Sequence, residues 1–153
     1  MSESVNVQPV LRKAERLCLE RGVRLTRQRR LALEIICARD KPVGAYEILE
    51  AMREAIPGAA PPTVYRALDF LLAQGLIHKL QTIHAFVGCN HPEHPHSSQF
   101  LICEDCGDVT EVEDQAVTRS LQRTASALGF KAGRRVVEVV GTCSGCGDAS
   151  GSA

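Results

Sequence analysis

Tryptophan is absent from the 153 residues, and aromatic side chains make up only 4% of the chain. This scarcity argues against a protein that stacks the bases of single-stranded nucleic acid on aromatic side chains. No apolar stretch approaches the length of a membrane span, and the N-terminus lacks the apolar core of a signal peptide. We therefore expect a cytoplasmic protein with no membrane partner.

A net charge is also lacking, because 18 basic residues balance 18 acidic ones. Taken as an average, this balance argues against a protein that binds nucleic acid. The average is misleading, since residues 1–80 contain 13 basic and 9 acidic residues, whereas the remainder contains 5 and 9. The chain thus combines a basic half (+4) with an acidic half (−4), and all five histidines and five of the seven cysteines lie between His78 and Cys146.

Hydrophobic periodicity predicts an N-terminal domain over residues 1–80. Apolar residues at helical spacing indicate four helices, near 10–21, 26–40, 44–56 and 62–74, and alternation from Leu76 to Gly88 indicates a β-hairpin. Helices followed by a small hairpin are typical of a winged helix, in which a helix-turn-helix is braced by a β wing.

The C-terminal part predicts a small α/β domain. We expect strands at 99–103 and 109–112, a helix at 114–128, a strand at 130–142 and a disordered tail from Gly147. The predicted fold is therefore α+β, with domains at 1–80 and 91–153 and a hinge at 81–90. The second domain would bury little surface alone, so we expect a homodimer.

Two Cys-x-x-Cys pairs, each followed by glycine, predict a metal site in the second domain. Four thiolates complete the tetrahedral shell of a structural Zn²⁺, and a two-residue spacer directs two sulfur atoms at one ion. The ligands are Cys103, Cys106, Cys143 and Cys146. Cys18 and Cys37 lie among helical apolar residues and are interpreted as buried side chains.

A second group of metal ligands gathers near the hinge. All five histidines lie within nineteen residues, beside Cys89 and the carboxylates Glu93 and Glu111. One thiolate, two imidazoles and a carboxylate would suit Zn²⁺ better than Mn²⁺ or Fe²⁺. Spacing alone does not decide which histidines take part.

Basic residues crowd the start of the second helix. Five arginines occur in ten residues without an acid, namely Arg21, Arg24, Arg27, Arg29 and Arg30. Beside a helix-turn-helix pattern, such a cluster favours contacts to DNA phosphates over a merely solvated face. Thr63, Tyr65 and Arg66 lie at the N-terminal end of the fourth helix, where a recognition helix meets base edges. Periodicity alone leaves open whether Tyr65 instead caps the core.

Several motifs in this order resemble the ferric uptake regulator family. They are Arg24-Leu-Thr-Arg-Gln-Arg29, Pro62-Thr-Val-Tyr-Arg-Ala-Leu68 and the two Cys-x-x-Cys pairs, and the stretch Pro61–Lys79 is most similar to the zinc uptake regulator branch. The resemblance covers about residues 8–147. It implies a dimeric repressor that binds an AT-rich palindromic operator of zinc-uptake genes when zinc is plentiful.

The resemblance also implies roles for individual residues. By position, Cys103, Cys106, Cys143 and Cys146 hold a structural zinc, and a regulatory zinc is held by His78, Cys89, His96 and Glu111. That gives two Zn²⁺ per chain and leaves His84, His91 and His94 without a role. Tyr46 and Arg66 are implied to contact bases. Arg27 stands where the family usually has proline, which leaves the path of the basic segment on DNA open.

Other functions fit the sequence less well. His91-Pro-Glu93 followed by Cys103 superficially resembles the zinc deaminase motif, but Ile102 stands where proline is expected and only nine residues separate Glu93 from Cys103. We therefore expect no enzyme and no small-molecule substrate. The remaining alternatives are a regulator of the same family that senses iron, manganese or peroxide, and a zinc-ribbon interaction module that does not bind DNA.

Overall fold

The computed structural model describes residues 5–94, 97–133 and 135–149. The chain divides into two compact units, within Met1–His94 and Pro95–Ala153. None of the helices in the described ranges is both long and apolar enough to cross a membrane. The predicted α+β fold, with an N-terminal winged helix and a C-terminal sheet that carries the cysteine pairs, is confirmed.

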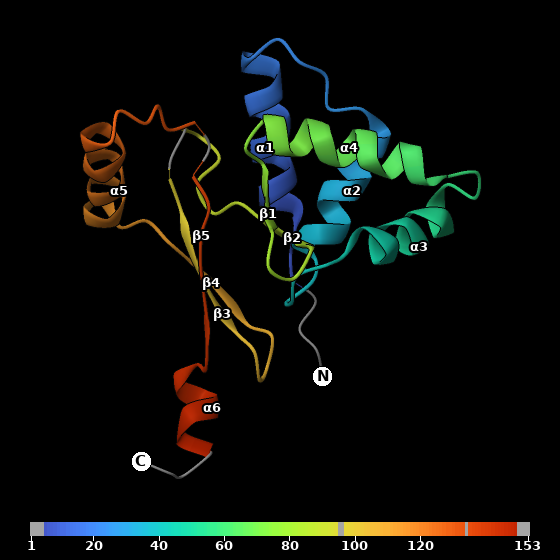
Figure 1. The fold of residues 1–153 in the computed structure, drawn as a ribbon. Coiled ribbons are helices and arrows are strands. Elements are labelled where there is room, and N and C mark those ends of the chain that lie inside the picture. Colours follow the sequence, from blue (N-terminus) through green and yellow to red (C-terminus); the bar gives the residue numbers. More distant parts are fainter. Residues whose placement is uncertain (1–4, 95–96, 134, 150–153) are drawn as a thin grey trace. The chain divides into compact units, whose positions relative to one another are not determined.

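The first unit consists of four helices and a hairpin (Figure 1). Its helices are α1 (Gln8–Glu20), α2 (Arg27–Cys37), α3 (Ala45–Ala55) and α4 (Pro61–Ala73), and its strands are β1 (Ile77–Leu80) and β2 (Ala85–Gly88). The Thr26 hydroxyl caps α2 by accepting the Arg29 N–H at 3.3 Å, as the sequence predicts. Gly75 ends α4 with a φ of 69°, a conformation that favours glycine.

A single hydrophobic core holds these helices against the hairpin. Its fully buried members come from all four helices and from β1, and they include Leu11, Leu33, Ile48, Met52, Leu68, Leu71 and Ile77. Val43, just before α3, pairs with Phe86 of β2 through two backbone hydrogen bonds of 2.8 and 3.0 Å. The wing is therefore tied to the helix-turn-helix by backbone pairing as well as by apolar burial.

The hairpin occupies part of the segment interpreted from sequence as a hinge. Ala85–Gly88 pairs with β1 in antiparallel register, with Leu80 opposite Ala85 and Ile77 opposite Gly88. The Cys89 N–H continues the pairing by donating to the Leu76 carbonyl at 3.0 Å. Residues up to His94 belong to the first unit. A hinge at 81–90 stays a prediction.

The second unit is a three-stranded mixed sheet with two helices (Figure 1). The strands β3 (Gln99–Cys103), β4 (Val109–Val112) and β5 (Val137–Gly141) lie in the order β4-β3-β5, antiparallel on one side of β3 and parallel on the other. Helix α5 (Gln115–Ala127) lies between β4 and β5 in the chain, and α6 (Ser144–Ala149) follows β5.

Two predictions for this unit were wrong in extent. The strand expected from Phe130 begins only at Val137, because the parallel ladder starts where Gln99 of β3 becomes available as its partner. Residues 147–149, expected to be disordered, belong to α6, because the turn of the second cysteine pair is helical and continues into these residues. Residues 150–153 lie outside the described ranges.

Candidate metal centres and nucleic-acid interface

The four paired cysteines meet at one end of the C-terminal sheet. Cys103 is the last residue of β3, and Cys143 follows β5, the strand that pairs with β3 in parallel. The pairing of these two strands therefore brings the two cysteine pairs to the same end of the sheet. In both pairs the glycine N–H closes the turn onto the first cysteine, from Gly107 to the Cys103 carbonyl at 2.9 Å and from Gly147 to the Cys143 carbonyl at 2.8 Å.

The geometry of this cluster fits one tetrahedral ion. The four sulfur atoms lie within 4.8 Å of one another, and those of Cys106 and Cys143 are 3.8 Å apart. A tetrahedral site with Zn–S bonds of about 2.3 Å has sulfur atoms about 3.8 Å apart. The donor set and its spacing therefore match a closed structural Zn²⁺ site, as the sequence predicts.

Electrostatics favour thiolate at one corner of this cluster. Backbone N–H groups, first that of Cys106 and then that of Cys143, lower the pKa of Cys103 to about 6 because they stabilise the anion. The Cys143 N–H lies 3.3 Å from the Cys103 sulfur. Hydrogen bonding to the sulfur atoms of Cys143 and Cys106, followed by burial, raises the pKa of Cys146 to about 12. A divalent cation removes this conflict, because it neutralises the charge that four thiolates would otherwise concentrate.

Two further cysteines lie in or against the core of the first unit, Cys18 and Cys37. Burial raises the pKa of Cys37 to about 11, and burial likewise raises that of Cys18. Both are neutral thiols at physiological pH, which agrees with their interpretation as small buried side chains.

The first unit brings together two residues of the second candidate metal site. His78 lies in β1 and Cys89 follows β2, and a ring nitrogen of His78 lies within 4.8 Å of the Cys89 sulfur. Both side chains are half-buried. In the second unit, Glu111 of β4 accepts a hydrogen bond from the Ser98 hydroxyl at 2.7 Å. His96, the fourth ligand implied by the family resemblance, lies outside the described residues.

Helix α4 presents a polar face at its N-terminal end. Val64, Ala67 and Leu68 are buried, whereas Arg66 is exposed and Tyr65 is 56% exposed. This exposure settles the question that periodicity left open, because Tyr65 lies outside the core. Thr63 is half-buried in the first turn, and Tyr46 near the start of α3 is 71% exposed.

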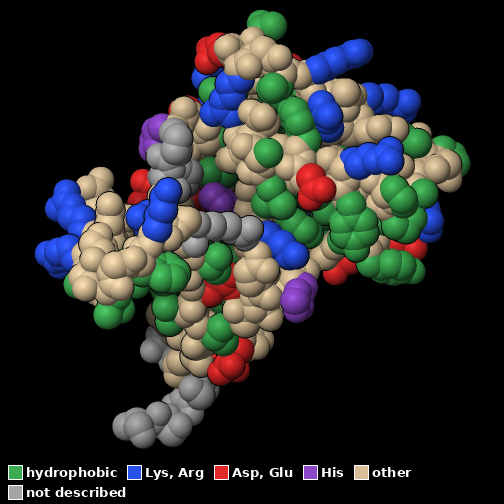
Figure 2. Space-filling model, turned by 45° about the horizontal axis from the view of Figure 1, so that its top comes forward, with side chains coloured by type: hydrophobic (Ala, Val, Ile, Leu, Met, Phe, Trp, Pro, Cys, Tyr) green, Lys and Arg blue, Asp and Glu red, His purple; other side chains and the backbone are tan. Residues whose placement is uncertain are grey.

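The arginine cluster separates into two groups. Arg24 and Arg27 are exposed, and within the described ranges their side chains make no hydrogen bond or ion pair. Arg29 donates to the Arg24 carbonyl at 2.6 Å and lies over the Phe70 ring at 3.9 Å, while Arg30 pairs with Glu15 at 2.7 Å. Figure 2 shows Lys and Arg side chains distributed over the surface of the helical unit. The arginine cluster therefore includes side chains that hold the fold together as well as two that are free for a partner.

Two basic residues, Lys13 in α1 and Arg21 directly after it, have contacts that the sequence did not suggest. Lys13 pairs with Glu93 and lowers the pKa of that carboxyl by donating a hydrogen bond to it. Arg21 reaches the Gln74 and Pro92 carbonyls. The contacting residues are 53 to 80 positions apart in the chain. Periodicity and motif spacing cannot predict contacts between residues so far apart in the sequence, so these contacts are seen only in the folded chain.

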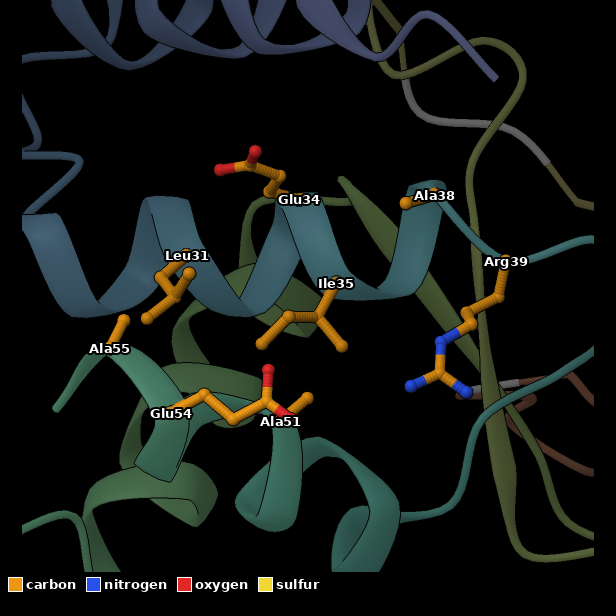
Figure 3. A pocket seen from close by; sticks show the side chains of 8 residues that line it. All are labelled: Leu31, Glu34, Ile35, Ala38, Arg39, Ala51, Glu54 and Ala55. Carbon is orange, nitrogen blue, oxygen red and sulfur yellow. The ribbon is translucent and has the colours of Figure 1, made fainter. Parts of the chain in front are cut away.

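A groove of about 420 Å³ runs between α2 and α3 (Figure 3). Leu31 and Ile35 point from α2 toward Ala51 and Ala55 of α3, and Glu54 and Arg39 lie at the groove as charged side chains. Among the described residues that line it, none is a histidine or cysteine. The charged residues of its lining are Glu34, Glu54 and Arg39.

Comparison with known proteins shows which family the chain belongs to. A model described as "Ferric uptake regulator family" matches residues 20–140. The chain belongs to the ferric uptake regulator family. It is 41% identical over 145 residues to the "Zinc uptake regulation protein" of Escherichia coli (strain K12), which covers 94% of this chain and 85% of that protein. It is 31% identical to the protein of that name from Mycobacterium tuberculosis, covering 82% of this chain and 95% of the relative.

Solved structures agree with this assignment. One, described as "Zinc Uptake Regulator Complexed With Zinc AND DNA", matches with a TM-score of 0.92 and 39% identity, covering 97% of this chain and 99% of that one. Another, described as "Crystal structure of holo XcZur", matches with a TM-score of 0.86 and 48% identity, covering 92% and 98%. This family member is therefore a homologue of zinc uptake regulators and a transcription regulator, not an enzyme.

Proposed function

We propose that the protein is a zinc-responsive transcriptional repressor in the cytoplasm, whose zinc-loaded homodimer binds palindromic operator DNA of zinc-uptake genes. The observation that supports this most directly is the likeness, over 97% of the chain, to a regulator bound to zinc and DNA. Its ligands are metal and double-stranded DNA, and no small-molecule substrate is involved.

The structural zinc belongs to Cys103, Cys106, Cys143 and Cys146. An ion held by these four residues would link the end of β3 to the segment after β5, and four thiolate ligands would leave no coordination position open for a reaction. Such a site contributes directly to folding, because the ligands form one cluster only in the folded chain.

The regulatory zinc belongs to His78, Cys89, His96 and Glu111, which makes two Zn²⁺ per chain. The closeness of His78 and Cys89 within the first unit supports this set, as does the mixture of thiolate, imidazole and carboxylate donors. The chemistry that zinc supplies there is coordination alone. His78 and Cys89 come from the winged-helix unit and Glu111 from the second unit, so occupation would restrict how the two units are arranged.

That restriction links the metal to DNA. In a dimer, the arrangement of the units sets the spacing of two recognition helices against the half-sites of an operator. Zinc would favour the competent arrangement within a population of arrangements. By reciprocity, operator DNA must tighten the binding of the regulatory zinc by the same factor.

The DNA face is formed by residues of three segments of the first unit. Arg24 and Arg27, both exposed, contact phosphates, and Arg29 holds the Arg24 backbone in place for them. The N-terminal end of α4 enters the major groove, where Arg66 is suited to guanine. Thr63, Tyr65 and Tyr46 complete the contact surface.

The second unit supports dimerisation. No described residue of α5 is buried within the chain, although its apolar residues recur at helical spacing. Phe130 and Leu128 after this helix are 68% and 78% exposed, and Val139 of β5 is 53% exposed. Surfaces of this kind are covered in stable proteins by a partner, for which a second copy is the simplest candidate.

A zinc titration of Cys89→Ser tests the assignment. The wild type is expected to bind an operator fragment from a zinc-uptake promoter about 5–150-fold more tightly in zinc than in chelator, and the variant to lose most of that ratio. Gel shifts or fluorescence anisotropy supply the affinities, and Cys18→Ala is the control because its thiol lies in the core. A variant with undiminished zinc dependence would rule out Cys89 as a sensing ligand. Parallel titrations with Fe²⁺ and Mn²⁺ test the alternative metals.

A further inference from the structure

The side chain of Arg21, the residue directly after α1, connects the end of the recognition helix to the segment that carries Cys89. Arg21 follows α1, and one guanidinium nitrogen donates to the Gln74 carbonyl at 2.7 Å, with the Gln74 side-chain oxygen 3.5 Å away. The other nitrogen donates to the Pro92 carbonyl at 2.8 Å. Gln74 is the C-terminal cap of α4, and Pro92 lies three residues beyond Cys89.

The first of these contacts is favourable for a helix terminus. The last carbonyls of α4 have no partner within the helix, and the helix dipole makes this end negative. A guanidinium satisfies such a carbonyl with a charge-assisted hydrogen bond. Arg21 thus stabilises the C-terminal end of α4 while its other nitrogen remains available for Pro92.

Polar contacts attach the segment after the wing to the helical unit at both of its ends. The Cys89 N–H is bound to the Leu76 carbonyl at 3.0 Å, and Glu93 pairs with Lys13. Between these attachments lies a cavity of about 220 Å³, lined by Pro9, Val10, Lys13, Leu33, Leu76, Cys89, Asn90 and Pro92. Polar contacts at both ends of the segment thus help to fix the path of residues 89–93.

We propose that Arg21 and Lys13 are positioning residues that transmit the metal state of Cys89 to the recognition helix α4. The inference rests on the proposed function, and it assigns to α1 a coupling role in addition to its place in the core. When Cys89 is drawn into a metal site, the displacement reaches Pro92, and Arg21 conveys it to the end of α4. Without Arg21 the same metal would bind, but α4 would no longer respond fully.

The geometry explains why arginine serves here. Two separate nitrogens of a rigid planar group reach two carbonyls on different segments, whereas lysine offers a single nitrogen on a flexible stem. Arg21→Lys therefore keeps the charge and loses the bridge. Arg16 offers a matched control, since it lies on the same helix, is 61% exposed and pairs only with Glu20 among the described residues.

The experiment compares Arg21→Met, Arg21→Lys and Arg16→Met in the full-length protein. Operator affinity is measured for each with zinc and with chelator, and the ratio of the two dissociation constants reports the coupling. We expect both Arg21 variants to lower the wild-type ratio of about 5–150 by at least about fivefold, and Arg16→Met to leave it unchanged. An equal loss of affinity in zinc and in chelator for Arg21→Met and Arg16→Met would show a plain phosphate contact and overturn the proposal.

Hydrogen exchange gives a readout that needs neither zinc nor DNA. In both Arg21 variants, amides of residues 89–94 and of the C-terminal turn of α4 are expected to exchange faster than in the wild type, while the core of α2 stays protected. Unchanged exchange in residues 89–94 would overturn the proposal. If Arg21→Met does not fold, Arg21→Lys provides the same comparison.

A charge swap tests the second attachment. Lys13→Glu places like charges beside Glu93 and is expected to lower the zinc ratio, and the double variant Lys13→Glu with Glu93→Lys is expected to restore most of it. Failure of the swap to restore the ratio would remove Lys13 from the proposal. If the wild type binds the operator equally with and without zinc, the proposed function fails, whereas a zinc-dependent wild type with unaffected Arg21 variants contradicts the coupling role alone.

Discussion

At the scale of single residues, identical side chains have different roles. Arg24 and Arg27 are exposed, whereas Arg29 lies over Phe70 and Arg30 pairs with Glu15. A cation that is already hydrogen-bonded inside the protein loses those contacts if it moves to a phosphate. Fewer arginines are therefore available to DNA than the charge of the cluster suggests. We expect Arg24 and Arg27 to account for most of the salt-dependent DNA binding of this cluster.

The closest backbone approach in the wing gives a stability prediction. A Cβ on Gly88 would lie 2.9 Å from the Cys37 sulfur, so Gly88→Ala forces the Cys37 side chain or the β2 backbone to shift. We expect the substitution to lower the free energy of unfolding by about 1–3 kcal/mol, the usual cost of overpacking. Urea denaturation of the full-length protein measures the change.

Matched variants separate this clash from the general effect of adding alanine. Gly58→Ala meets nothing within 4 Å and should alter stability by less than about 0.5 kcal/mol. Adding Cys37→Ala to Gly88→Ala should cost less than the sum of the two single changes, because the sulfur that causes the clash is removed. Strict additivity would contradict the close contact.

At the scale of elements, α4 divides its residues between core and surface. Val64, Ala67, Leu68 and Leu71 are buried, and the exposed Tyr65 and Arg66 lie between them on the other face. Helical periodicity is sufficient to predict the buried stripe. Which element meets DNA is a different question, and it depends on the surface that the other helices leave uncovered.

Arg66→Ala tests the recognition face. If Arg66 reads a base, the variant should bind the operator about 1–3 kcal/mol more weakly and discriminate less against a changed base at one position. Competition with point-mutated operators measures both effects. Arg123→Ala removes the same charge from an exposed position of α5 and is expected to leave operator affinity nearly unchanged. Equal weakening on all sequences would instead make Arg66 a phosphate contact.

At the scale of the whole molecule, the two units have different sources of stability. The first has a continuous apolar core, while α5 of the second contributes no buried residue and the cysteine cluster lies at one end of its sheet. A small unit with little burial depends on a metal, a partner or both. We therefore expect the second unit to be the part that zinc removal unfolds.

Cys103→Ser tests this dependence. The variant is expected to lose one tightly held zinc per chain, dimerisation and the ordered C-terminal sheet, while the first unit keeps its helical signal. Metal analysis, sedimentation and hydrogen exchange measure these changes. Cys18→Ala alters a buried cysteine of the other unit and should leave zinc content and dimerisation intact. A stable dimeric Cys103→Ser protein would contradict the structural role of the site.

Features that depend on residues close together in the chain can be predicted from the sequence. The helices, the caps at Thr26 and Gly75, the hairpin and both cysteine pairs follow from periodicity and spacing, because the interactions that define them span only a few positions. Residue identity also fixed the metal chemistry, since thiolate preference for zinc does not depend on the fold.

Contacts between residues far apart in the sequence arise only from the tertiary structure. It alone placed β3 beside β5 so that Cys103 meets Cys143, exposed Tyr65, engaged Arg29 with Phe70 and brought Arg21 to Gln74 and Pro92. Such contacts follow from the packing of whole elements, and no local pattern records them. The difference in charge between residues 1–80 and the rest of the chain indicated two distinct halves. Only the fold shows which arginines of the basic half are exposed and which make contacts within the protein.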